Sequence, residues 1–421
     1  LPDFSTCHRY VYGYLYLRQV YFDTILLFMS MEKIINQLDI AMKRRTNRLP
    51  ERLRLFTANT QTLPRALSLT GARGVGKTTF LLHHAQNRTM LHLSMDNPLL
   101  SGTSLYELAS SIFMAGYEGV VVDEVHFAKD WSLHLKALYD DFPDHTIWTS
   151  DSSSLVLRNG VADLSRRFVT MEMPLLSFRE FLHLETGIKY LPYDPFIGSN
   201  SSLPEADASL LMAFQKYKKC GTRPFYTEEN FDERMLAVLD KTLYYDVPFF
   251  LSNVSDGNLR LMKAISATLA ESPIPRLSVN SLCTDWSIGS DKLYQLLEVM
   301  EAVGFLRLIR TENDKKARSA GKKLFFADPV YYSVLGGSIG NMREAMVSMC
   351  CENAGWKLEA CKDEPSGDFV ISRRKNNANE QYKIEVGGAS KNIKKADFVI
   401  RDDTDIRTQN AIPLWMIAMM Y

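Results

Sequence analysis

The chain has 421 residues, of which 46% are hydrophobic and 23% are charged, and its formal net charge is zero. These values are ordinary for globular proteins and exclude a disordered, collagen-like or coiled-coil chain, while the length predicts two to four domains. A neutral chain has no overall field that favours nucleic acid or a membrane, so such binding requires a local patch. The six cysteines show no zinc-type spacing, which predicts reduced thiols in a cytoplasmic protein.

The first 45 residues form an N-terminal segment. Residues 10–31 are apolar and aromatic, but an arginine, a glutamine and an aspartate interrupt them, so they lack the clean apolar run of about 18–20 residues that a spanning helix needs. We expect no membrane segment and interpret residues 1–30 as an appended or upstream-translated segment. The alternative is a genuine N-terminal helix that packs on the core. From Met31 a helix is predicted, with apolar residues at helical spacing: Ile34, Ile35, Leu38 and Met42.

Within a predicted core at residues 46–174, residues 66–172 alternate short apolar runs with helical stretches, a pattern typical of a parallel sheet joined by crossover helices. The runs are nearly continuous, as expected for strands that helices cover on both faces. We therefore predict an α/β core whose parallel strands lie at 66–70, 90–95, 119–124, 145–150 and 167–173.

A glycine-rich segment follows the first of these strands. Gly71, Gly76, Lys77 and Thr78 satisfy the pattern G-x-x-x-x-G-K-[ST], which binds phosphate between a strand and a helix. Its backbone N–H groups would face phosphate oxygens at the helix N-terminus, Lys77 would reach the β- and γ-phosphates, and Thr78 would ligate Mg²⁺. The alternative is a chance glycine-rich turn. The predicted nucleotide-binding residues of this segment are Gly71, Gly74, Val75, Gly76, Lys77, Thr78 and Thr79.

A second motif, "GVVVDEVH", supplies carboxylates at the end of the third strand. Asp123 is predicted to hold Mg²⁺, and Glu124 to orient and deprotonate the attacking water. A solvated acidic strand end is the alternative. Two motifs in the expected order favour a nucleotide site in which Lys77 and Glu124 take part in catalysis.

Polar residues of the last two strands complete the predicted site. At the end of the fourth strand, Thr149 or Ser150 would contact the γ-phosphate or the water, unless "TSDSSS" is a plain serine-rich turn. Arg166 or Arg167, at the start of the fifth strand, would stabilise γ-phosphate charge in its own chain or in a neighbouring subunit. A surface arginine is the alternative.

The pattern becomes helical beyond Pro174. Residues 175–255 predict a helical subdomain, and residues 256–330 predict two helices joined by a turn and followed by a hairpin, which is a winged helix. Ser290 is expected to cap the second helix and Gly304 to end it. The basic hairpin loop is a candidate for salt-sensitive phosphate contacts with DNA, and an intramolecular packing module is the alternative. Its basic residues are Lys315, Lys316, Arg318, Lys322 and Lys323.

The segments "GARGVGKTT", "GVVVDEVH", "TSDSSS", "LSRRF" and "PLLSFREFL" occur in the order seen in prokaryotic ATPases of the AAA+/STAND-like group, which the sequence resembles over residues 31–421. The resemblance implies an ASCE-type P-loop core, a helical lid, a winged helix and a restriction-endonuclease-like α/β domain at 331–421, with ATP as the nucleotide. It also implies nucleotide-site roles for Arg73 and Arg167. The chain departs from the group at "SRR" (165–167), where relatives often have glycine before the arginine, so the role of Arg167 stays open.

The C-terminal domain carries part of a nuclease pattern. Restriction-type nucleases place an aspartate on one strand and Glu-x-Lys on the next, where the carboxylates bind Mg²⁺ and the lysine assists the water. Here Asp368 and Glu385 occupy such strands and Glu344 the preceding helix, but Gly387 replaces the lysine. We predict a nuclease-like fold that is inactive, with unrelated surface acids as the alternative. The candidate substitutes for the lysine are Lys383, on the same strand face, and Lys391, in a loop.

The sequence as a whole predicts a MgATP-binding protein that hydrolyses ATP slowly and acts as a conformational switch, in which the nucleotide state repositions the lid and the winged helix. Two alternatives stay open. One is an ATP-regulated DNA-binding protein that uses the winged helix, and the other, less favoured, is an ATP-gated nuclease. An oligomer is compatible with an arginine supplied by a neighbouring subunit.

Overall fold

A computed structural model describes residues 31–152, 164–197, 203–251, 255–275, 278–312, 321–362, 366–375, 378–393 and 395–421. The predicted segment 1–30 therefore lies outside the described residues. Within them, no helix combines the length and apolar character needed to cross a membrane. Residues 31–46 are helical, and Ile35, Leu38 and Met42 are buried in the core, so this helix packs on the domain as its spacing predicts.

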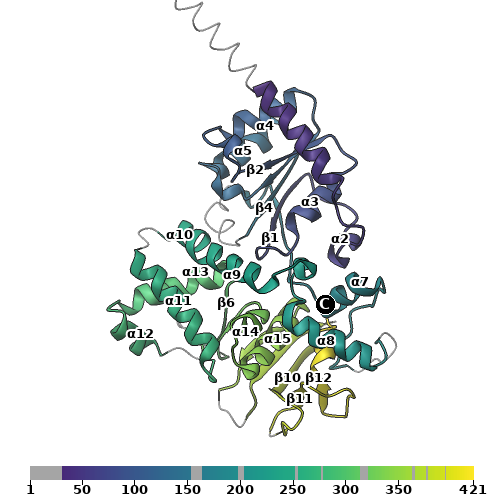
Figure 1. Cartoon of the computed structure of the whole chain (residues 1–421), viewed down its shortest axis with the longest axis vertical. Coiled ribbons are helices and arrows are strands. Elements are labelled where there is room, and N and C mark those ends of the chain that lie inside the picture. The colour runs from purple at the N-terminus through teal and green to yellow at the C-terminus, as the bar shows by residue number, and fades with distance from the viewer. Residues whose placement is uncertain are drawn as a thin grey trace, which may run out of the picture.

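The N-terminal half contains the predicted parallel sheet (Figure 1). Its strands are β1 (Ala66–Thr70), β2 (Met90–Ser94), β3 (Gly119–Asp123), β4 (Thr146–Asp151) and β5 (Val169–Glu172), in the order β2-β3-β4-β1-β5. The helices α3 (Lys77–Ala85), α4 (Leu105–Met114) and α5 (Trp131–Asp141) flank it. All the predicted strands are confirmed. The edge strand β5 departs from the expected burial on both faces, and most of its residues are exposed.

The order of the strands explains where a ligand would bind. β1 pairs in parallel with β4 and β5, and β3 pairs in parallel with β2 and β4. Parallel strands end at the same edge, so the residues that follow β1, β3 and β4 meet there. Open α/β sheets bind ligands at this carboxyl edge.

Helices occupy the middle of the chain. They are α7 (Phe178–Thr186), α8 (Ala208–Cys220), η3 (Pro224–Thr227), α9 (Phe231–Lys241), the π-helical segment η4 (Thr242–Asp246), α10 (Val247–Phe250), α11 (Asp256–Glu271), α12 (Val279–Asp285) and α13 (Ser290–Ala302). The antiparallel strands β6 (Leu306–Ile309) and β7 (Lys323–Phe326) follow, as predicted. Gly304 ends α13 with a φ of +73°, but Gly289 caps the start of that helix without a side-chain bond, so the predicted cap at Ser290 is wrong by one residue.

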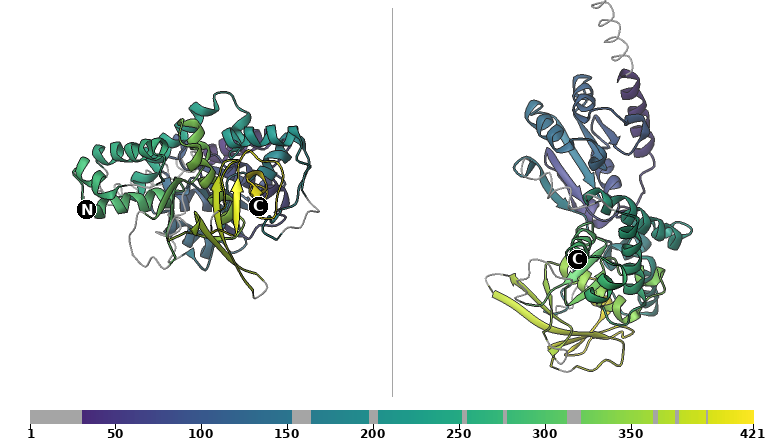
Figure 2. Two further views of the ribbon diagram at one scale, coloured as in Figure 1. Left: turned by 90° about the horizontal axis from the view of Figure 1, so that it is seen from below. Right: turned by 90° about the vertical axis from the view of Figure 1, so that its left-hand side faces the viewer.

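The C-terminal part is a second α/β unit, at the opposite end of the molecule from the first sheet (Figure 2). After α14 (Val330–Val334) and α15 (Ile339–Asn353) come β8 (Lys357–Ala360), β9 (Phe369–Lys375), β10 (Ala378–Gly387), β11 (Phe398–Arg401), β12 (Ala411–Pro413) and α16 (Leu414–Ile417). The sheet order is β12-β11-β10-β9-β8, with parallel pairing only from β10 to β12. The end of the chain returns to the helical part, because Phe178 N–H donates to the Ala418 carbonyl over 3.1 Å.

Candidate functional site

The glycine-rich loop joins β1 to α3, as predicted. Its glycines at 71, 74 and 76 all have left-handed backbone conformations, with φ values of +146°, +77° and +102°. A Cβ atom on Gly74 would lie 2.5 Å from the ring of Phe225, so both the conformation and the space require glycine there. Gly76 is the N-cap of α3, which directs the first N–H groups of the helix toward the loop.

The ammonium of Lys77 is folded into this loop. Its Nζ donates to the carbonyls of Gly71, over 2.7 Å, and Ala72, over 3.1 Å. Lys77 is only 7% exposed, and this burial lowers the pKa of its ammonium, although the nearby carboxylates of Glu124 and Asp123 oppose the shift. The loop thus surrounds one cation at the N-terminus of a helix, which is the arrangement that binds phosphate.

Asp123, at the end of β3, contacts the start of α3. Thr78 Oγ1 donates to Asp123 Oδ2 over 2.6 Å, and the Ser150 hydroxyl donates to Oδ1. Burial would raise the pKa of Asp123, but the His92 ring, Ser150 and Thr78 outweigh it and lower that pKa well below its ordinary value. A hydroxyl and an ionised carboxylate are oxygen ligands that Mg²⁺ accepts, so Thr78 and Asp123 fit a metal bound together with phosphate.

Glu124 follows Asp123 and is held by an arginine of the loop. It has a left-handed backbone with φ of +52°, uncommon for a residue with a side chain. Arg73 Nη1 donates to Glu124 Oε1 over 2.8 Å, and its Nε and Nη2 donate to both oxygens of Asp246 over 2.7 and 2.6 Å. Burial raises the pKa of Glu124, although Arg73 and Lys77 oppose this shift. Arg73 therefore lies between the predicted base and the helical part of the chain.

A histidine completes the carboxyl edge. His126 Nδ1 lies 2.6 Å from Asp151 Oδ2 and 3.7 Å from Glu124 Oε2, a spacing that a metal ion could bridge. Burial disfavours the charged imidazole, but Asp151 and then Glu124 outweigh it and raise the pKa of His126. His126 thus joins the carboxylates of Asp151 and Glu124 in one cluster at the carboxyl edge of the sheet.

Two predicted residues lie elsewhere. Thr149 pairs with Ser68 inside the sheet and donates to the Leu67 carbonyl over 3.2 Å, so it does not reach the loop, and Ser150 takes the predicted place beside Asp123. Arg167 precedes β5, at the opposite edge of the sheet, and pairs with Asp140 over 2.9 Å. Arg167 therefore does not contact the phosphate-binding loop of its own chain.

Other residues of the site were not predicted. They are His92, His126, Asp151, Arg223 and Asp246. Asp151 directly follows one predicted strand and His126 lies two residues after another, so strand order alone could have indicated them. Arg223 and Asp246 come from the helical part, and nothing in their local sequence indicates that they fold back onto the loop.

The acidic residues of the C-terminal domain do come together. Asp368 Oδ2 accepts from Val386 N–H over 2.8 Å, and Lys391 Nζ lies 3.1 Å from Glu385 Oε1 and 4.0 Å from Asp368 Oδ2. A Cβ atom at Gly387 would lie 2.7 Å from the Lys391 side chain, so this side chain uses the space that glycine leaves. The ammonium that pairs with Glu385 is thus that of Lys391, which is one of the two predicted substitutes.

Lys323 joins this acidic cluster and is not available as a DNA contact in this structure. Its Nζ bonds Glu344 and lies 2.8 Å from Asp368 Oδ1. Burial opposes the charge on Lys323, but Glu344 and Asp368 outweigh it and raise its pKa. Lys322 donates to the Lys362 carbonyl over 3.4 Å. The other predicted DNA contacts, at 315, 316 and 318, lie outside the described residues.

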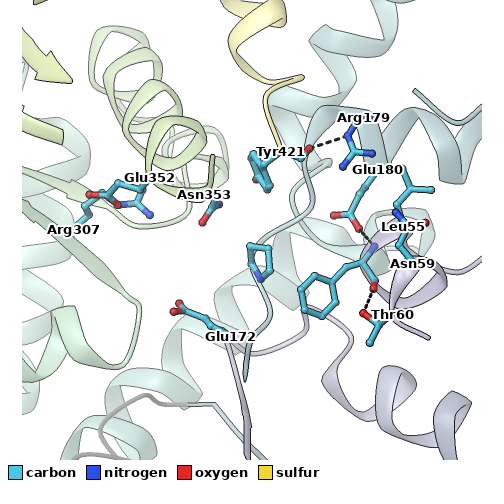
Figure 3. Close-up of a pocket in the computed structure, with 12 residues that line it drawn as sticks. Leu55, Asn59, Thr60, Glu172, Arg179, Glu180, Arg307, Glu352, Asn353 and Tyr421 are labelled. Carbon is cyan, nitrogen blue, oxygen red and sulfur yellow. Dashed lines mark hydrogen bonds and ion pairs between the residues drawn. The ribbon is translucent and has the colours of Figure 1, made fainter. Parts of the chain in front are cut away.

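A cavity of about 670 Å³ lies away from the loop, where α2 (Leu55–Asn59), α7, β6, α15 and the C-terminus meet (Figure 3). Its arginines have partners, because Arg307 pairs with Glu352 over 2.7 Å and Arg179 donates to the Tyr421 carbonyl over 3.0 Å. The cavity thus lies between segments from the N-terminal, helical and C-terminal parts of the chain.

Comparison with known proteins agrees with this geometry. A family described as an AAA domain matches residues 63–182. The uncharacterized protein MJ1637 of Methanocaldococcus jannaschii is 28% identical over 370 residues, covering 78% of this chain and 76% of that protein. The family match and the strand–loop–helix geometry support an AAA-type P-loop ATPase domain, which indicates nucleotide binding and ATPase activity.

Solved structures with similar folds are more distant. The Walker-type ATPase PABY2304 of Pyrococcus abyssi is 14% identical with a TM-score of 0.37, covering 65% of this chain and 91% of that one. A RuvB mutant of Thermotoga maritima is 15% identical with a TM-score of 0.30, covering 66% and 89%. Likeness at this level adds no argument about activity.

Proposed function

We propose that the chain is a Mg²⁺-dependent ATPase that uses slow hydrolysis to switch the position of its helical and C-terminal modules. The observation that carries this proposal is the meeting of Lys77, Thr78, Asp123 and Glu124 at one edge of the sheet. A phosphate chain needs a buried cation, a metal ligand pair and a base within one small volume, and these residues supply them.

Each residue has a definite task in this proposal. Lys77 exchanges its bonds to loop carbonyls for β- and γ-phosphate oxygens, and the loop N–H groups hold the same phosphates. Mg²⁺, when bound by Thr78 and Asp123, would neutralise phosphate charge. Glu124 accepts the proton of the attacking water, a role that the burial-raised pKa of its carboxyl suits.

The switch is proposed because helical residues touch the loop directly. Arg73 pairs with Asp246 of η4, and its carbonyl accepts from Arg223, which precedes η3. A nucleotide that moves the loop therefore moves groups that the helices hold. We propose residues 175–255 as the lid, and residues 256–330 as a winged helix that serves as a packing module, since Lys323 of its hairpin is bound to the C-terminal domain.

ATP turnover by the purified chain tests this function. We expect Lys77→Ala and Glu124→Gln to lower Mg²⁺-dependent turnover by at least about a hundredfold, because each removes a group that acts in the transition state. Lys33→Ala and Glu32→Gln, on exposed positions of the first described helix, are matched controls that keep wild-type turnover. Wild-type protein that turns over no ATP above background would exclude the proposal.

A further inference from the structure

We propose that Asp246 is a positioning residue for hydrolysis, which acts through Arg73 on Glu124 and so transmits the position of the helical lid to the base. This inference rests on the proposed ATPase function and adds a regulatory contact to it. The contact consists of three side chains from three segments that lie far apart in the sequence.

The geometry of Arg73 is set by Asp246. Two N–H groups of the guanidinium, on Nε and Nη2, bind the two oxygens of Asp246 over 2.7 and 2.6 Å. This two-point contact fixes the plane of the guanidinium, and the remaining Nη1 then points at Glu124 Oε1, 2.8 Å away. The side chains of Arg73, Asp246 and Glu124 are only 10%, 3% and 16% exposed. Water therefore screens these contacts little.

Asp246 is placed by an unusual backbone. It is the last residue of the π-helical segment η4, which joins α9 to α10. Such segments are rare and are frequent at functional sites, since they shift a side chain away from the register of an α-helix. Ser152, which follows β4, also donates to Asp246 Oδ2 over 3.3 Å. Asp246 thus contacts both the loop and the edge of the sheet.

The same loop residue has a second attachment to the lid. Arg223 Nη1 donates to the carbonyl of Arg73, and Arg223 Nε pairs with Asp328 Oδ2 over 2.7 Å. Asp328 in turn accepts from Val330 N–H, at the start of α14, over 3.1 Å. Side chain and carbonyl of Arg73 are therefore held by separate parts of the helical region, one of which is bonded to the C-terminal half.

These contacts give Asp246 a specific effect on Glu124. The single positive charge of Arg73 lies between the carboxylates of Asp246 and Glu124. Asp246 therefore limits how strongly Arg73 stabilises the ionised form of Glu124. When Asp246 loses its charge, Arg73 binds Glu124 alone, its plane is no longer fixed, and Glu124 becomes a weaker and less well directed base. Asp246 contacts neither Lys77 nor Thr78, so the binding of ATP itself is affected less than its hydrolysis.

Steady-state kinetics of full-length variants test this relay. We expect Asp246→Asn to lower kcat about tenfold, the size expected for loss of one hydrogen bond to a charged group, with KM for ATP changed less than about twofold. Asp246→Glu, which keeps the charge, should stay within about threefold of wild type. Asp240→Asn, an exposed lid aspartate paired with Lys263, is the matched control and should leave kcat unchanged.

A double-mutant comparison separates this role from a merely structural one. If Asp246 acts through Arg73, Asp246→Asn should change kcat less than about twofold in the Arg73→Met background. An Asp246→Asn effect of equal size in both backgrounds would overturn the relay, as would wild-type kcat in the single variant. Absence of wild-type turnover would instead refute the proposed ATPase function, so the two failures are distinguishable.

Discussion

The buried pair of Arg54 and Glu180 joins the segment before the sheet to α7, and its loss should destabilise the protein strongly. Arg54 Nη2 lies 2.6 Å from Glu180 Oε2, and both side chains are about 5% exposed or less. Glu180 also accepts from Phe56 N–H over 2.9 Å and belongs to the capping box of α7. Glu180→Gln keeps the shape of the side chain but leaves Arg54 without a counter-charge.

The magnitude follows from this burial. Removing one partner of a buried ion pair costs about 3–5 kcal/mol, because the remaining charge stays desolvated. The Arg54 side chain cannot easily rotate into solvent, since its Nη1 also donates to the carbonyls of Val75 and Pro174 over 2.8 and 2.9 Å. We therefore expect Glu180→Gln to lower the free energy of unfolding by about 3–5 kcal/mol. With an m-value of about 3 kcal/mol/M, the urea midpoint falls by at least about 1 M.

The effect should depend on pH in a defined direction. Burial alone would raise the pKa of Glu180, but Arg54 and the backbone donors outweigh it and lower that pKa below its ordinary value. A carboxyl with a lowered pKa stabilises the fold above the pKa of the unfolded chain, and this stabilisation is lost as pH falls through the folded value. The difference between wild type and Glu180→Gln should thus be constant above about pH 5 and shrink in more acidic solution.

Urea unfolding followed by circular dichroism between pH 4 and 8 measures both effects. Glu51→Gln, at an exposed glutamate three residues before Arg54, is the matched control and should unfold at the wild-type urea midpoint. A Glu180→Gln midpoint that coincides with the Glu51→Gln midpoint at neutral pH would refute the argument. A difference that grows in acid would show that the sign of the pKa shift is wrong.

Three further predictions concern single sites. Gly74→Ala should weaken ATP binding about tenfold in a calorimetric titration, because the left-handed backbone of Gly74 and the nearby Phe225 ring exclude a Cβ atom. Gly102 is also left-handed, but no atom lies within 4 Å of the position that its Cβ atom would take, so the Gly102→Ala control should bind ATP normally. Arg167→Ala should leave ATP turnover of the isolated chain unchanged, since Arg167 pairs with Asp140 away from the nucleotide site. A large loss of turnover would mean that Arg167 of a second copy acts at this site. Lys323→Ala should destabilise the C-terminal domain by up to about 3 kcal/mol in thermal or urea unfolding, because Glu344 and Asp368 lose their shared cation, and Lys322→Ala should cost much less.

The N-terminal fold could be predicted because its signals are local. Each strand is a short apolar run, and the glycines, Lys77 and Thr78 lie within eight residues of sequence. Once the strands are parallel, their order brings Asp123 and Glu124 to the same edge as the loop. The sequence could not decide between Thr149 and Ser150, because alternate residues of a strand point to opposite faces, and in the structure only the Ser150 hydroxyl contacts Asp123.

The contacts from the helical and C-terminal parts could not be predicted in this way. Asp246 lies 173 residues from Arg73, and Lys323 lies 45 residues from Asp368. A basic cluster in a loop is expected to be solvated or to bind phosphate, so only the packing of the hairpin against α15 and β9 reveals that Lys323 serves an internal ion pair. Such long-range pairs depend on how modules dock, which one sequence without relatives does not specify.

The donors around the phosphate-binding loop explain why docking and nucleotide binding should be coupled. A loop that turns its N–H groups toward a phosphate must turn carbonyls outward, and buried carbonyls need donors. Here the donors are long cationic side chains from different modules, since Val75 is held by Arg54 and the Arg73 carbonyl by Arg223. Loss of either contact would leave a loop carbonyl without this donor, so we expect the loop to keep its phosphate-binding shape best while the segment before the sheet and the helical part are both in place. We therefore expect nucleotide affinity to depend on the positions of these modules, and by linkage we expect a bound nucleotide to favour the positions in which the loop is held.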